Sequence, residues 1–177
     1  MTKTDRNSIL DAVFILNDIL DALVAGTMVF DRYQSKYAEG EFSKAGIVAV
    51  QKMCVSHIVL ALSRLIEFWQ TYNRLVPIDL QPDVKAVVSK LQRRDLMQYR
   101  STVVAHIRDK KLGRARTQFE AIEHLNRLSD NNPIAFLSWL NNAKDNSSQK
   151  TVACIVESMR DQICSENDVS AEEVFQR

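Results

Sequence analysis

Apolar residues recur every three or four positions through most of this 177-residue chain, and this spacing constrains the fold more than any other feature. A helix turns by about 100° per residue, so side chains at this spacing share one face and can be buried together. The pattern predicts one long helix from about Ser8 to the mid-thirties and a second between Ser43 and Pro77. Only 4 Gly and 3 Pro interrupt the chain, which is too few for the many tight turns of an all-β fold.

Helix-start signals place shorter helices in the second half of the chain. Thr117 and Glu120 have the spacing of a capping box, in which each side chain satisfies a free backbone amide. Asn132 and Pro133 are typical of a cap and a first turn. We therefore expect an all-α, up-and-down helical bundle with two long N-terminal helices followed by shorter helices. The apolar stripes of the shorter helices run through 84–91, 96–107, 121–128, 136–140 and 152–163.

The length of the chain suits one compact domain, because a single hydrophobic core usually serves ~100–200 residues. We expect that helical domain to comprise residues 1–164. Residues 165–177 are acidic and carry little apolar surface. We expect them to form a C-terminal tail that does not pack firmly.

The spacing of Cys and His argues against a disulfide framework and against a metal site. The Cys residues are odd in number, and neither they nor the three His show a C-x-x-C or an i, i+4 His pair. We expect no metal and no cofactor. Asp residues interrupt the apolar N-terminal stretch, and no run approaches the ~20 apolar residues that span a bilayer, which favours a cytoplasmic protein.

Charge is distributed unevenly along the chain. The net charge of +1 excludes a uniformly cationic binder of nucleic acid or membranes. Residues 90–116, however, contain nine basic and two acidic residues, which gives this segment a charge of +7. The rest of the chain carries a charge of −6. Such a run is either a solvated helix face or a surface that faces an anion.

Arg100 interrupts an apolar stripe in the basic run. The stripe contains Leu96 and Val103, and Arg100 and His106 flank Val103 on the same half of the expected helix. A buried Arg is costly unless it is paired, so this position requires a carboxylate partner or a bound anion. Asp18 and Glu67, on the two long helices, are the possible partners.

Arg100 and His106 are separated by five residues, and Arg108-Asp109-Lys110 follows. This arrangement, late in an all-α chain, resembles the HEPN superfamily of helical bundles, and most closely its abortive-infection branch. The family motif is an Arg, four to six residues and a His. The residue after the Arg is often Asn, Asp or His in active members, and Ser101 stands there in this chain.

The resemblance implies a metal-independent endoribonuclease or RNA-binding protein that acts as a homodimer, with two copies of the motif meeting across a cleft. In that reading Arg100 holds the phosphate oxygens and His106 transfers a proton as the RNA 2′-hydroxyl attacks. It further implies a phage-defence or toxin-type effector with a nucleotidyltransferase-like antitoxin as its partner. The residues expected to bind RNA or support the site are Tyr99, Ser101, Arg108, Asp109, Lys110 and Lys111.

A second reading of the same residues stays open. His106 is then a helix-surface histidine near Asp109, and Arg100 is one member of a structural ion pair. In that case the chain is a non-catalytic helical-bundle module that keeps the fold and binds a protein partner.

Overall fold

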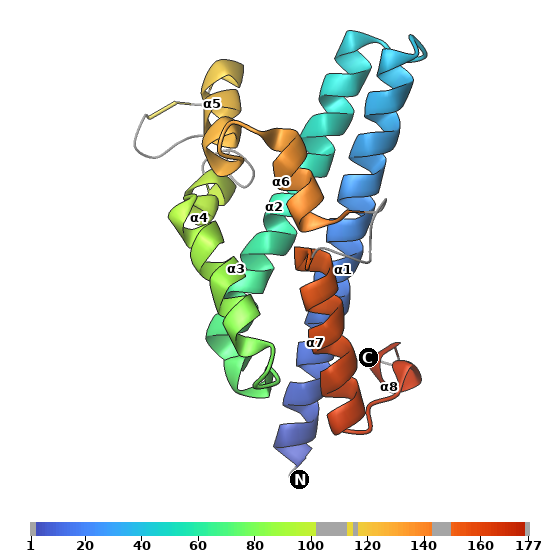
Figure 1. Ribbon diagram of the computed structural model, residues 1–177, viewed down its shortest axis with the longest axis vertical. Coiled ribbons are helices and arrows are strands. Elements are labelled where there is room, and N and C mark those ends of the chain that lie inside the picture. The colour runs from blue at the N-terminus through green and yellow to red at the C-terminus, as the bar shows by residue number, and fades with distance from the viewer. Residues whose placement is uncertain (1–2, 102–112, 115–116, 143–149, 176–177) are drawn as a thin grey trace.

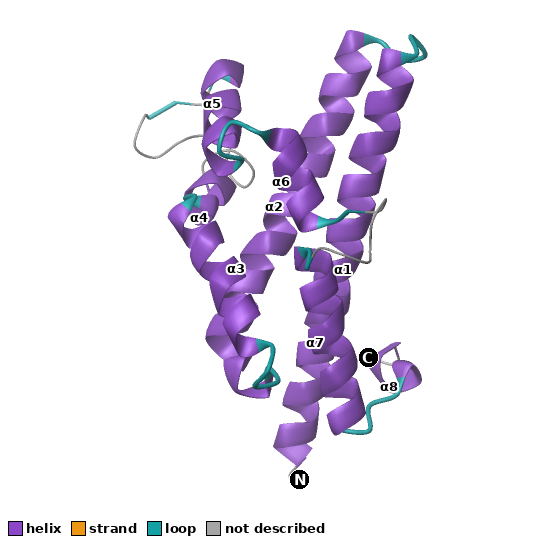
Figure 2. Ribbon diagram, in the orientation of Figure 1, coloured by secondary structure: helices purple, strands orange, loops and turns teal. Residues whose placement is uncertain are grey.

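The computed structural model describes residues 3–101, 113–114, 117–142 and 150–175. Its secondary-structure elements over these residues are all helices, which confirms the predicted all-α bundle with two long N-terminal helices (Figure 1, Figure 2). The helices are α1 (Lys3–Ala38), α2 (Lys44–Tyr72), α3 (Gln81–Arg93), α4 (Leu96–Tyr99), α5 (Gln118–Leu128), α6 (Pro133–Leu140), α7 (Val152–Glu166) and α8 (Ala171–Phe175), with a 3₁₀ turn at Asn73–Leu75.

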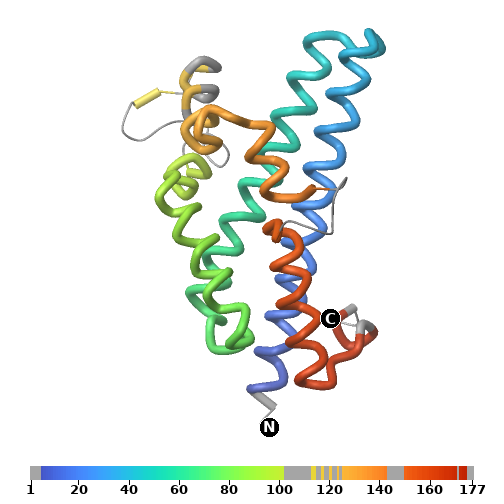
Figure 3. Tube along the Cα trace, in the orientation of Figure 1, coloured from blue at the N-terminus to red at the C-terminus, as the bar shows by residue number. Residues whose placement is uncertain are grey.

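The two long helices form an antiparallel hairpin on which the rest of the bundle is built (Figure 3). Their backbones approach closely at Gly26, where an added Cβ would lie 2.7 Å from Cγ1 of Ile58. Helix α7 covers α1, and α3 and α4 cover α2, around one continuous apolar core. The end of the hairpin that holds residues 38–44 projects beyond these shorter helices (Figure 1).

Capping side chains fix the helix starts that the sequence predicts. Thr117 Oγ1 accepts from the Glu120 amide, and the Glu120 carboxylate accepts from the Thr117 amide, so the capping box is confirmed. Asn132 caps α6 by accepting from the Ala135 amide at 3.0 Å, with Pro133 in the first turn. These caps hold α5 and α6 in the places expected from the local sequence.

The predicted helix through the basic run begins with a sharp bend. Asp95 has φ 54° and ψ 33°, in the left-handed region, and this residue separates α3 from α4. Leu96 and Tyr99 then point into the core. Arg100 and Ser101 continue in a wider, π-type helical turn, and residues 102–110 of the predicted helix lie outside the described residues.

The expectation of a loosely packed tail after residue 164 is wrong for residues 165–175. Val169 and Val174 are 9% and 3% exposed and belong to the apolar core. Arg6 of α1 also forms an ion pair with Glu173 at 2.7 Å. Two well-placed valines and one ion pair dock α8 onto α1, although the segment is polar overall.

Helices α1 and α2 are each long and apolar enough to cross a membrane by length and hydropathy alone. Core helices of water-soluble proteins meet the same criteria, and part of both segments is buried within the bundle. The cytoplasmic location therefore stays a prediction.

Candidate functional site

Arg100 is held at the bundle surface by Glu67, one of the two partners that the sequence indicates. Its Nη1 donates to Oε1 of Glu67 on α2 at 2.6 Å, and the two side chains are 35% and 50% exposed. No other described residue accepts from Nη2 or Nε of Arg100. The guanidinium is thus fixed at one nitrogen and keeps further donors for an anion. Asp18, the other suggested partner, instead pairs with Arg64 at 2.9 Å.

The neighbours of Arg100 divide between core and surface. Tyr99 is 5% exposed, and burial raises the pKa of its phenol. Tyr99 packs in the core, and this burial argues against direct contact with RNA, while its other expected role, support of the site, stays a prediction. Ser101 is exposed, and its hydroxyl donates to the Gln98 carbonyl at 3.0 Å, which closes the local turn.

The remaining predicted site residues lie outside the described residues. They are His106, Arg108, Asp109, Lys110 and Lys111. Of the predicted site residues, the structure therefore describes Tyr99, Arg100 and Ser101. It also shows Glu67 as the ion-pair partner of Arg100.

Carboxylates neutralise several cations of the basic run. Besides Arg100, Arg94 pairs with Asp130, and Arg114 makes two hydrogen bonds to Glu120 at 2.7 and 2.9 Å. The Arg114 guanidinium and the Thr117 amide lower the pKa of Glu120 to about 2. These carboxylates belong to residues outside 90–116. The net positive charge of the folded protein around these cations is therefore smaller than the local charge counted along the sequence.

Two cations in this region, one of them Arg94 itself, also lie over aromatic rings, which sequence analysis did not indicate. Lys90 Nζ lies 4.0 Å from the centroid of the Trp139 ring, and Arg94 lies 5.5 Å from that of Phe136. Helical spacing alone indicates that Trp139 packs in the core. No local sequence signal joins residues of α3 to a ring on α6.

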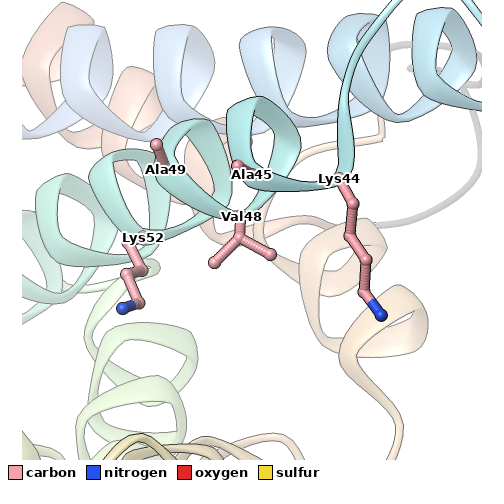
Figure 4. Close-up of a pocket in the computed structure, with 5 residues that line it drawn as sticks. All are labelled: Lys44, Ala45, Val48, Ala49 and Lys52. Carbon is pink, nitrogen blue, oxygen red and sulfur yellow. The ribbon is translucent and has the colours of Figure 1, made fainter.

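The projecting part of α2 carries an open groove of about 590 Å³ (Figure 4). Lys44 and Lys52 flank it, and both side chains extend from the same side of the helix. Its floor is formed by Ala45, Val48 and Ala49.

Metal-binding side chains do not cluster in the described part of the chain: no three His, Cys, Asp or Glu side chains come together there. The chemistry supported by the described residues is anion binding by guanidinium and ammonium groups.

No protein-family model matches the sequence, and no curated protein matches it. Among solved structures, the chain is similar to the integron cassette protein Vpc_cass2 from the mobile metagenome of V. paracholerae, with a TM-score of 0.77 and 19% sequence identity. The match covers 92% of this chain and 98% of that chain. At this identity the likeness shows a shared fold alone.

Proposed function

We propose that the chain is a HEPN-like, metal-independent endoribonuclease in which Arg100 and His106 are the catalytic residues. The observation that carries the proposal is the state of Arg100: Glu67 fixes one terminal nitrogen, and the remaining donors have no acceptor among the described residues. A guanidinium that is oriented but not saturated suits an anion whose charge grows during reaction.

The reaction is an internal transesterification. The 2′-hydroxyl of RNA attacks the adjacent phosphorus as His106 takes its proton, and the bond from phosphorus to the 5′-oxygen breaks. The imidazolium of His106 then gives this proton to the departing 5′-oxygen. Arg100 holds the non-bridging oxygens while negative charge accumulates on them. The products end in a 2′,3′-cyclic phosphate and a 5′-hydroxyl.

The proposal includes a homodimer in which the segment of residues 95–110 contributes to the interface, so that two motifs face one cleft. Light scattering tests this part. A dimer at micromolar concentration supports it, whereas a monomer over that range, or a dimer formed solely through α1 and α2, contradicts it. A phage-defence or toxin-type role with a nucleotidyltransferase-like antitoxin belongs to the same proposal. The mobile-metagenome origin stated for Vpc_cass2 fits such a role.

A protein-interaction module is the second candidate, and the groove on α2 favours it. The groove has an apolar floor, and it lies between Lys44 and Lys52 on α2 (Figure 4). We infer that a protein partner would contact α2 at this short apolar strip between two lysines.

Incubation of the purified chain with mixed single-stranded RNA in a chelator separates the two candidates. The endoribonuclease gives products with 2′,3′-cyclic phosphate ends, and Arg100→Ala weakens both cleavage and RNA binding. Arg64→Ala is the matched control, because it also removes an Arg from an exposed ion pair with an Asp or Glu. The absence of cleavage by the wild type, or equal loss in both variants, would favour the interaction module.

A further inference from the structure

Two cationic side chains, those of Lys90 and Arg94, lie over the ring of Trp139. Lys90 and Arg94 are one helical turn apart at the end of α3. Lys90 Nζ lies 4.0 Å from the Trp139 ring centroid, and Arg94 Cζ lies 5.6 Å from it. Phe136, also on α6, lies 5.5 Å from Arg94. These contacts restrict both cationic side chains to one side of α6.

Arg94 is incompletely satisfied within this cluster. Its side chain is 12% exposed, and Nη2 donates to Oδ2 of Asp130. Nη1 is buried and has no hydrogen-bond partner among the described residues. A buried donor without an acceptor destabilises a fold, so such a group indicates a missing acceptor. The Asp130 carboxylate accepts a hydrogen bond from only one of the two terminal nitrogens of Arg94.

The local electrostatics also favour an additional anion. Burial lowers the pKa of the Lys90 ammonium, and the positive charges of Arg94 and Arg93 lower it further. The negative charge of Asp130 raises the pKa of Lys90. Its side chain is 69% exposed, so a ligand arriving from solvent can reach and replace this carboxylate.

We propose that Lys90 and Arg94 bind a backbone phosphate of single-stranded RNA and that Asp130 occupies the phosphate position when RNA is absent. The identity of the ligand as RNA rests on the function proposed above. A phosphate can pair with both terminal nitrogens of a guanidinium, whereas Asp130 accepts from only one of them here. It also supplies the negative charge that two adjacent cations require. This site precedes Asp95 in the sequence, and Arg100 follows it.

The test measures binding of a fluorescently labelled 2′-O-methyl RNA, which lacks the attacking hydroxyl and separates binding from cleavage. Anisotropy titrations at several salt concentrations compare Lys90→Gln with Lys85→Gln, an exposed lysine on the same helix. We expect Lys90→Gln to weaken binding and to reduce the salt slope by ~0.7, the value for one phosphate contact with a single strand. Lys85→Gln is expected to leave the slope unchanged.

Asp130→Asn tests displacement of the carboxylate directly. We expect this variant to tighten RNA binding by ~2–5-fold, because it removes an exposed competitor for Arg94. Glu123→Gln on α5 makes the same charge change at an exposed position and is expected to have no such effect. Melting temperatures confirm that each variant is folded.

Three outcomes overturn this proposal: a Lys90→Gln effect equal to that of Lys85→Gln, weaker binding by Asp130→Asn, or Lys90-dependent binding of inorganic phosphate without binding of RNA. These binding measurements do not depend on catalysis, because the 2′-O-methyl RNA cannot be cleaved. If the 2′-O-methyl RNA binds through Lys90 while unmodified RNA is not cleaved, the endoribonuclease proposal fails and the phosphate site stands.

Discussion

Arg100 and Glu67 join the end of α4 to the C-terminal part of α2 through a 2.6 Å ion pair between residues 33 positions apart in the sequence. The pair is partly exposed at both side chains, so it contributes little to the free energy of unfolding, of the order of 0–1 kcal/mol. Its larger effect is on geometry, because it fixes the direction of a guanidinium that has other donors to offer.

Glu67→Gln tests Glu67 as a positioning residue. We expect kcat for RNA cleavage to fall while KM does not rise, because the variant loosens Arg100 and also removes a negative charge beside the RNA. The melting temperature should change only slightly. Asp18→Asn, which breaks the exposed pair with Arg64, is the matched control for stability and should leave kcat unchanged. A rise in KM with an unchanged kcat would show that Glu67 does not orient Arg100.

Val174→Ala tests the docking of α8. Val174 is 3% exposed in the core, and loss of two buried methyl groups should reduce the free energy of unfolding by ~1–2 kcal/mol. Glu172→Ala, an exposed change in the same helix, should remain within ~0.5 kcal/mol of wild type. Chemical denaturation measures both values. Equal stabilities of the two variants would mean that α8 contributes nothing to the core.

The low pKa of Glu120 leads us to predict that the free energy of unfolding decreases in acid. Its pKa falls from 4.5 to about 2 through the Arg114 guanidinium and the Thr117 amide. A carboxyl with a depressed pKa in the folded state stabilises the protein above its unfolded pKa, and this stabilisation is lost as pH falls through the folded value. Between about pH 4.5 and pH 2, wild type should therefore lose more stability than Glu120→Gln. Parallel pH profiles of the two proteins would contradict the proposed pairing.

The bundle and its caps could be predicted because the causes are local. Helical spacing defines α1 and α2, and neighbouring side chains define the caps at Thr117 and Asn132. The partner of Arg100 could be narrowed to two carboxylates, since a cation in an apolar stripe needs one. The choice of Glu67 over Asp18 depends on how α4 packs, which local sequence does not determine.

The features that could not be predicted depend on tertiary contacts. Nothing in the local pattern marks Asp95 as left-handed, because only Gly commonly signals that conformation. Val169 and Val174 reach the core through tertiary contacts, and α8 packs on α1, which is far away in the sequence. The stacking of Lys90 on Trp139 likewise joins two helices with no shared motif.

His106→Ala gives the most direct test of the central claim that this chain cleaves RNA through an Arg and a His. Wild type and variant are incubated with mixed single-stranded RNA in a chelator, and ends with a 2′,3′-cyclic phosphate are quantified. We predict that the variant keeps a nearly unchanged melting temperature and cleaves ~10²–10⁴-fold more slowly, as expected on loss of one general acid or base. The same slow background from both proteins would contradict the account and leave the chain as an interaction module.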